Sequence, residues 1–314
     1  MPATQSPGDI IVQVNNLTKS YGKFRAVDSI SFEVRTGEVF GFLGPNGAGK
    51  TTTARILTGV LKADAGSALI FGYPAGSIRA KQSIGVVPET ANPYADLSAW
   101  DNMMLMAELY GVSGHTARER ATEFLRELGL LERRQTLAKG YSKGMRQRLV
   151  LGMALIGDPQ ILFLDEPTSG LDVQSARLLR GLLRTFNDEG KTIFITTHDM
   201  EEANQLCNRI AIISHGKIAA IDAPEKIKLA TKNLHSVEVS FDRPVEAASV
   251  ASLKGVNSMK EAGDKFKLYT TDPGSLASLL VHYAESNSLR IVTINTLAPS
   301  LEDAFVTLVG EGAK

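Results

Sequence analysis

The 314-residue sequence contains one cysteine, one tryptophan and only 6% aromatic residues. The lone cysteine, Cys207, cannot form an internal disulfide, and no second cysteine is present to share a zinc or iron–sulfur site with it. We therefore expect Cys207 to be a core residue on one face of a helix. The chemistry of the chain must come from other residue types.

The chain also lacks an excess of charge of either sign, because 34 basic and 34 acidic residues give a net charge of +0. This balance argues against nucleic acid as a partner and against plain adsorption to anionic lipid. No run of about 18 apolar residues occurs, which argues against a membrane-spanning helix. Residues 1–9, which we expect to be a disordered lead-in, lack the basic and apolar regions of a secretory signal. We expect a cytoplasmic chain that another protein recruits if it works at a membrane.

The most informative stretch is residues 44–52, which read Gly-Pro-Asn-Gly-Ala-Gly-Lys-Thr-Thr. An apolar run precedes it and a helical pattern follows it, which is the context of a phosphate-binding loop. Glycines let backbone N–H groups surround a polyphosphate, and the helix N-terminus adds positive potential. In such a loop Lys50 supplies a cation to the outer phosphates, and the Thr51 hydroxyl can ligate Mg²⁺.

A second block begins with the continuous apolar run 161–164, which is typical of a strand buried on both faces of a parallel sheet. The run ends in Asp165 and Glu166. Asp165 can hold Mg²⁺, and Glu166 can polarise an attacking water as general base. His198 follows another buried strand, at the end where open α/β sheets bind ligands. A structural histidine is the alternative, but after such a core we favour a sensor of the γ-phosphate.

Strands and helices alternate through the middle of the chain, which predicts an α/β fold with a mainly parallel sheet. Two short strands before the phosphate loop predict an antiparallel β element, and the pattern loosens at about 219–233. Beyond Ser236, short strands and helices predict a small α+β domain. The predicted organisation is a lead-in at 1–9, a core domain at 10–230 with a helical subdomain at about 89–157, and an accessory domain at 231–314.

Together these motifs resemble the nucleotide-binding subunit of an ATP-binding cassette (ABC) transporter over roughly residues 10–230. The resemblance implies a P-loop ABC ATPase core with ATP and Mg²⁺ as cofactors. It places Asp172 in the segment called the D-loop and His198 at the switch histidine. It also implies that Tyr21 stacks on adenine, although a surface turn residue is the alternative for Tyr21. The nucleotide contacts that it implies near the phosphates and base are Tyr21, Gly44, Pro45, Asn46, Gly47, Ala48, Gly49, Lys50, Thr51 and Thr52.

Two positions depart from the family pattern. The signature segment, usually Leu-Ser-Gly-Gly-Gln, reads Tyr-Ser-Lys-Gly-Met at 141–145. Ser142 and Gly144, which the resemblance assigns to the γ-phosphate across a dimer, are kept, and Ser142 is also suited to cap a helix. Glu89 stands where the family has a glutamine. A carboxylate at Glu89 can still reach Mg²⁺ or water, but it cannot donate a hydrogen bond as an amide does.

The resemblance implies a head-to-tail dimer, either of two copies or with a paralogous ATPase, that closes on ATP and reopens after hydrolysis. Residues 299–305, Pro-Ser-Leu-Glu-Asp-Ala-Phe, are similar to a motif of ABC-2-type exporter ATPases, and they also suit a helix capped by Ser300 and Asp303. We therefore expect export through separate integral membrane permease subunits, which would dock near residues 89–110. The alternative is a soluble cassette ATPase that remodels a cytoplasmic assembly.

Overall fold

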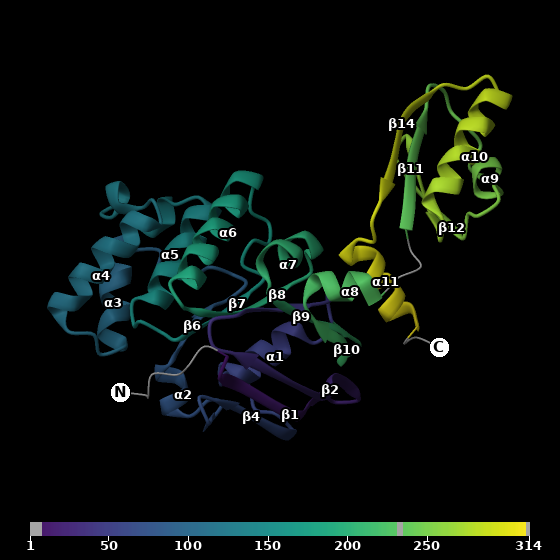
Figure 1. Ribbon diagram of the computed structural model, residues 1–314. Coiled ribbons are helices and arrows are strands. Elements are labelled where there is room, and N and C mark those ends of the chain that lie inside the picture. The colour runs from purple at the N-terminus through teal and green to yellow at the C-terminus, as the bar shows by residue number, and fades with distance from the viewer. Residues whose placement is uncertain (1–7, 231–234, 312–314) are drawn as a thin grey trace. The chain divides into compact units, whose positions relative to one another are not determined.

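The computed structural model describes residues 8–230 and 235–311, and the chain divides into two compact units (Figure 1). The first unit extends to Ala223 and the second begins at Pro224. This boundary lies before helix α8 (Pro224–Ala230), whereas the sequence placed it after residue 230. Helix α8 packs against α11 (Leu301–Glu311) within the second unit, which explains the difference. Most of the lead-in expected at 1–9 lies outside the described residues.

The first unit is built on a mixed central sheet in which all strands are parallel except one at the edge. The parallel strands are apolar and almost completely buried, as the sequence predicted for the apolar run at 161–164. The antiparallel edge strand, β10, falls in a region whose pattern was too loose to predict it. The strand order is β10 (Lys217–Asp222), β9 (Arg209–Ser214), β3 (Val39–Leu43), β8 (Thr192–Thr197), β7 (Ile161–Asp165) and β6 (Ile84–Val87).

A second sheet in this unit is antiparallel, as the two predicted strands before the phosphate loop indicated. It consists of β2 (Phe24–Arg35), β1 (Ile10–Tyr21), β4 (Ala65–Ile70) and β5 (Tyr73–Pro74), in that order. Helix α1 (Lys50–Leu57) shares one apolar core with both sheets. Rings from the two sheets stack directly in this core, with the centroids of Phe32 and Phe40 5.6 Å apart. The phosphate-loop helix is thereby held between two sheets.

The remaining helices of the first unit surround the central sheet. In Figure 1, α6 and α7 lie on the opposite side of this sheet from α1. Helices α3, α4 and α5 pack on one another, and α5 also contacts β6 and α6. Cys207 is buried against Gly41 of β3 as expected, but it follows α7 in an extended conformation instead of lying on a helix face, and burial raises the pKa of its thiol. The helices are α2 (Ile78–Gln82), α3 (Ala99–Leu109), α4 (Gly114–Glu127), α5 (Lys143–Leu155), α6 (Val173–Asp188) and α7 (Met200–Leu206), with short 3-10 turns η1 (Leu131–Arg133) and η2 (Ala138–Gly140).

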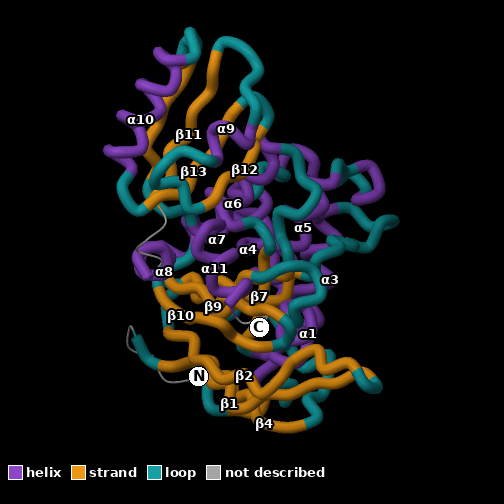
Figure 2. The backbone as a smooth tube through the Cα atoms, turned by 90° about the vertical axis from the view of Figure 1, so that its right-hand side faces the viewer, coloured by secondary structure: helices purple, strands orange, loops and turns teal. Residues whose placement is uncertain are grey.

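The second unit contains an antiparallel sheet with α9 and α10 on one face (Figure 2). The apolar core between them includes Val237 and Val239 of β11, Leu268 of β13 and Leu276 and Leu280 of α10. The predicted α+β character is therefore present, although α8, α9 and β12 were not foreseen. The elements after α8 are β11 (His235–Phe241), α9 (Ala247–Ala251), β12 (Ser258–Ala262), β13 (Lys265–Thr270), α10 (Pro273–Ser286), β14 (Ile291–Leu297) and α11, and the strand order is β12-β13-β11-β14.

In the two described ranges, 8–230 and 235–311, every helix is too short or too polar to cross a lipid bilayer.

Helix α11 is bonded to the sheet of the second unit through one buried carboxylate, Asp303. Asp303 is 5% exposed and accepts hydrogen bonds from Lys267 Nζ at 2.9 Å and from the Tyr269 hydroxyl at 2.8 Å. Ser300 and Asp303 also exchange hydrogen bonds at the start of the helix, which confirms the predicted capping. Burial opposes ionisation of Asp303, but the bonds from Ser300, Lys267 and Tyr269 outweigh it and hold its pKa below the usual value.

We expect Asp303→Ala to destabilise the docking of α11 by about 3 kcal/mol, because it leaves a partly buried ammonium and a partly buried hydroxyl without their acceptor. Hydrogen exchange of the amides of residues 301–311 measures this loss. Glu302→Ala is the matched control, since Glu302 pairs with Lys260 on the surface, where ion pairs contribute little. Equal exchange rates in the two variants would contradict the assigned role of Asp303.

Candidate functional site

The loop at 44–52 connects β3 to α1 and is closely packed at two of its glycines. A Cβ on Gly44 would lie 2.3 Å from the carbonyl oxygen of Ile213, and one on Gly49 would lie 2.3 Å from that of Ala26. Gly49 also has a φ of +107°, a conformation that L side chains rarely adopt. The loop is therefore held against strands β2 and β9, with the N-terminus of α1 at one end of a cavity.

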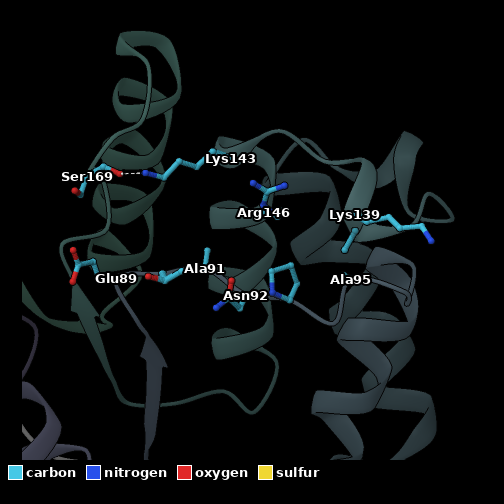
Figure 3. Close-up of a pocket in the computed structure, with 11 residues that line it drawn as sticks. Glu89, Ala91, Asn92, Ala95, Lys139, Lys143, Arg146 and Ser169 are labelled. Carbon is cyan, nitrogen blue, oxygen red and sulfur yellow. Dashed lines mark hydrogen bonds between the residues drawn. The ribbon is translucent and has the colours of Figure 1, made fainter.

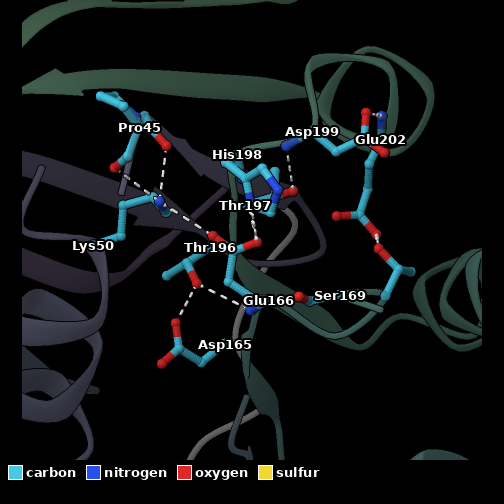
Figure 4. A network of polar contacts seen from close by, with 12 residues as sticks. Pro45, Lys50, Asp165, Glu166, Ser169, Thr196, Thr197, His198, Asp199 and Glu202 are labelled. Atoms are coloured by element: carbon cyan, nitrogen blue, oxygen red, sulfur yellow. Dashed lines mark hydrogen bonds and ion pairs between the residues drawn. The ribbon is translucent and has the colours of Figure 1, made fainter. Parts of the chain in front are cut away.

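Lys50 opens α1, yet its side chain turns back over the loop (Figure 4). Its Nζ donates hydrogen bonds to the carbonyl oxygens of Gly44 at 2.8 Å and Pro45 at 3.1 Å. It also lies 3.1 Å from Oε1 of Glu166, and both side chains are less than a tenth exposed. This last approach is a charge contact without hydrogen-bond geometry. The cation is thus held in place by two carbonyls and one carboxylate.

Asp165 lies at the end of β7 and meets two hydroxyl groups through one oxygen. Thr51 donates to its Oδ1 at 3.2 Å, and Thr196 of β8 donates to the same atom. Thr196 is fully buried and also accepts from the backbone N–H of Glu166 at 3.2 Å. Sequence reasoning did not single out Thr196, because a threonine in a buried β-strand is unremarkable by pattern alone. It aligns the two carboxylates that end β7.

Glu166 is bound between Lys50 and His198. The Nδ1 atom of His198 lies 2.7 Å from Oε2 of Glu166, and the backbone N–H of His198 donates to the same oxygen at 3.3 Å. Glu166 itself has a φ of +47°, which is uncommon for a residue other than glycine and is often found at functional sites. Since an ionised carboxylate only accepts, the ring proton is on Nδ1 in this arrangement, and Nε2 of a neutral His198 is an acceptor.

A cavity of about 250 Å³ lies over the loop and brings most of the predicted site residues together. Ala26 and Ser169, which were not predicted, also line it, as does Phe24. Phe24 pairs with Tyr21 across the β1–β2 turn, and these two aromatic side chains are 61% and 50% exposed at the rim. A strand-pairing prediction would have found Phe24. The predicted residues that line the cavity are Tyr21, Asn46, Gly47, Gly49, Lys50, Thr51, Thr52, Glu89, Glu166 and His198.

Seven predicted site residues are not found among the described residues that line this cavity. Ser142 caps α5, with its Oγ accepting from the N–H of Met145 at 3.2 Å, and Gly144 packs against Ser175. Asp172 caps α6 by accepting from the N–H of Ser175 at 2.9 Å, and this bond lowers the pKa of Asp172. The other four are Gly44, Pro45 and Ala48, which belong to the loop itself, and Asp165, which accepts a hydrogen bond from Thr51. One chain therefore brings the phosphate loop and its carboxylates together, but not the segment at 142–145.

Sequence and structure comparisons agree on the family. The profile described as "ABC transporter" matches residues 27–169. The linearmycin resistance ATP-binding protein of Bacillus subtilis is 34% identical over 96% of this chain and 98% of that protein. A Nod factor export ATP-binding protein of Ralstonia nicotianae is 36% identical over 96% and 94%. The chain belongs to the ABC transporter ATP-binding proteins.

Solved structures agree with this assignment. An ATP-binding cassette determined as a dimer in a post-hydrolysis state, bound to ADP and Pi, matches with a TM-score of 0.61 at 26% identity, over 68% of this chain and 98% of that one. This chain is accordingly a nucleotide-binding ATPase of the cassette type. The predicted family, the fold class and the enzyme class are all confirmed.

Behind the cassette site, a carboxylate that the sequence did not point to connects two of its segments. Glu202 of α7 is fully buried and accepts from the Thr168 hydroxyl at 2.8 Å, just downstream of Glu166 (Figure 4). Its other oxygen, Oε2, has no hydrogen-bond partner in the described chain. Burial raises the pKa of Glu202 above its ordinary value of 4.5, and the charge of Asp199 adds to this effect.

Because the pKa of Glu202 is raised in the folded protein, titration of this residue should make the stability of the protein depend on pH. The folded protein favours the protonated carboxyl, so its stabilisation is complete below about pH 4.5 and is lost as the pH rises through the folded pKa. Glu202→Gln cannot titrate. The melting temperature of Glu202→Gln minus that of the wild type should therefore increase as the pH is raised from 5 to 8. A constant difference between the two melting curves across this range would show that Glu202 is already ionised throughout.

Proposed function

We propose that this chain is the ATP-hydrolysing subunit of an ABC exporter and that it works in a head-to-tail dimer. The observation that carries the proposal is the incomplete site: the phosphate loop, Glu166 and His198 share one cavity, whereas Ser142 and Gly144 lie outside it. In the proposed dimer, the segment at 142–145 of a second chain completes the site on the γ-phosphate. The second chain is another copy or a paralogous ATPase. The related cassette solved as a dimer with ADP and Pi supports this arrangement.

The proposed cofactors are ATP and Mg²⁺. The Thr51 hydroxyl and the Asp165 carboxylate lie 3.2 Å apart and offer the hard oxygen ligands that Mg²⁺ prefers. Among the described residues, no group of three or more histidine, cysteine or acidic side chains is placed to hold a metal ion by itself, so the phosphates and water would complete the coordination. Bound Mg²⁺ neutralises charge on the β- and γ-phosphates during transfer. Glu89, which also borders the cavity, is the third proposed oxygen ligand.

In the proposed cycle, the polyphosphate competes with Glu166 for the ammonium of Lys50. When Lys50 turns to the outer phosphates, Glu166 loses its buried counter-charge and becomes available to take a proton from the attacking water. His198 must then change its partner, because a neutral ring that donates from Nδ1 to Glu166 cannot donate from Nε2 to the γ-phosphate. Release of His198 from Glu166 would therefore accompany nucleotide binding.

The proposed base-binding surface is the pair of Tyr21 and Phe24. Both rings are exposed at the cavity rim without a buried structural role, and they are paired across the β1–β2 turn. Aromatic rings that line the same cavity as a phosphate loop are suited to stack on the adenine base.

The proposed membrane partner is a separate permease that docks near residues 89–110, on the cytoplasmic face of the membrane. A second cavity, of about 480 Å³, lies between the segment 89–95 and the start of α5 and could accept a short partner helix (Figure 3). Leu109, at the C-terminal end of α3 in the same range, is 66% exposed and adds an apolar side chain to the proposed docking segment. Glu89 borders both cavities, which supports a coupling role for it. The relatives named for antibiotic resistance and Nod factor export support export over remodelling of a soluble assembly.

Glu166→Gln tests the catalytic assignment. The amide cannot accept a proton from water, so turnover should fall by at least about a hundredfold. Nucleotide binding should persist, because Lys50 is no longer held by a carboxylate, and ATP with Mg²⁺ should trap a dimer that size-exclusion chromatography detects. Glu201→Gln, an exposed position on α7, serves as the matched control and should keep wild-type turnover. If the Glu166→Gln variant hydrolyses ATP at the wild-type rate, Glu166 is not the general base.

Tyr21→Ala and Phe24→Ala test the base-binding surface. Each should weaken ATP binding by about tenfold, which is within the range of one aromatic stacking contact, and Tyr21→Phe should bind normally. Calorimetric titration with inorganic tripolyphosphate provides the control, since a ligand without a base should bind all four proteins equally. If Tyr21→Ala binds ATP as tightly as the wild type, Tyr21 does not stack on the base and is only a surface turn residue.

A further inference from the structure

Lys143, one of the three residues that depart from the usual signature, makes a specific contact with the segment after the catalytic carboxylate. Its Nζ donates a hydrogen bond to the backbone carbonyl of Ser169 at 2.7 Å (Figure 3). Ser169 belongs to the segment 166–172, which connects the end of β7 to α6. The contact therefore joins the helical part of the first unit to the strand that carries Asp165 and Glu166.

The ammonium group of Lys143 lies directly against Gly170. Gly170 has a φ of +63°, and a Cβ at this position would lie 2.4 Å from Nζ of Lys143. The next residue on α5, Gly144, is packed against Ser175 of α6, where a Cβ would lie 2.5 Å from the hydroxyl oxygen. Two consecutive residues of the signature thus fit against the segment and the helix that follows it.

Lys143 contributes little to its own helix. It occupies the first turn of α5, where the helix dipole repels a cation. The hydrogen bond from Lys143 to the Ser169 carbonyl offsets this repulsion. We therefore relate the positive charge of Lys143 to Ser169 and not to its own helix. The usual glycine at this position has no side chain with which to reach Ser169.

The segment that Lys143 holds is continuous with the catalytic carboxylate. The N–H of Ser169 donates to the carbonyl of Glu166 at 3.0 Å, and the N–H of Leu171 donates to that of Thr168 at 3.1 Å. On the other side, Thr168 is bound to the buried Glu202 of α7. The segment is therefore held from two directions, by Lys143 of α5 and by Glu202 of α7.

We propose that Lys143 is a positioning residue that holds the segment 166–172 and so ties the signature of each chain to the catalytic Glu166 of the same chain. This inference rests on the proposed function for its consequence. In a head-to-tail dimer the signature of one chain faces the nucleotide of its partner, while its Glu166 faces its own nucleotide. The Lys143–Ser169 contact then links the two sites of the dimer.

The first test uses nucleotide-free protein and does not depend on dimer formation. Lys143→Met keeps an unbranched side chain of nearly the same length but removes the donor, so the amides of residues 168–172 should exchange about fivefold faster, the factor that one ordinary hydrogen bond supplies. Lys143→Arg, which can still donate to Ser169, should exchange at the wild-type rate. Lys139→Met is the control from the same cavity, because Lys139 is paired on the surface with Asp96. Unchanged exchange in Lys143→Met would overturn the proposal.

The second test separates positioning from direct phosphate binding. If Lys143 acts through Glu166, Lys143→Met should lower kcat about fivefold with the KM for ATP unchanged, and Lys143→Arg should restore kcat. A raised KM with normal kcat would assign Lys143 to the phosphate of the partner chain and overturn the positioning role. If exchange responds to Lys143→Met but Glu166→Gln traps no dimer, the contact stands and the proposed dimeric function fails.

Discussion

The buried ion pair of Lys50 and Glu166 is the interaction on which the geometry of the site depends. It joins the phosphate loop to the strand end across the central sheet, and neither group is more than a tenth exposed. A buried charge is tolerated only with compensation, and here two loop carbonyls accept from Lys50 while His198 donates to Oε2 of Glu166. A polyphosphate offers Lys50 a stronger anion than one carboxylate. In the proposed cycle, binding of the nucleotide to Lys50 would therefore free the Glu166 carboxylate at the same time.

This arrangement requires a phosphate loop of fixed shape, and the surrounding fold provides it. Helix α1 lies in one apolar core with both sheets of the first unit, while Gly44 and Gly49 press against backbone carbonyls of neighbouring strands. Thr196 then sets the relative position of Asp165 and Glu166. The segment at 166–172, which follows these carboxylates, is held from two sides by Lys143 and Glu202.

Local signals in the sequence predicted the loop, the acidic strand end, His198 and the parallel sheet, because each depends on a short run of residues with one physical cause. Contacts between distant residues were not predictable in this way. Phe24 is recognised only through its pairing with Tyr21, and Thr168 with Glu202 only after α7 is placed beside the segment. Strand β10 and helix α8 were missed because an edge strand and a short helix have weak hydrophobic periodicity. The motif at 299–305, by contrast, was correctly predicted as a capped helix, and the structure adds that Asp303 attaches this helix to the sheet.

The proposed composite site is tested most directly by joining its two halves chemically. Cysteines at Asn46 and Ser142, introduced with Cys207→Ala and Glu166→Gln, would lie in different chains around one nucleotide. A short thiol-reactive cross-linker should then give a covalent dimer only with ATP and Mg²⁺ and only when both cysteines are present. A chain that binds ATP yet remains an uncross-linked monomer under these conditions would contradict the composite site.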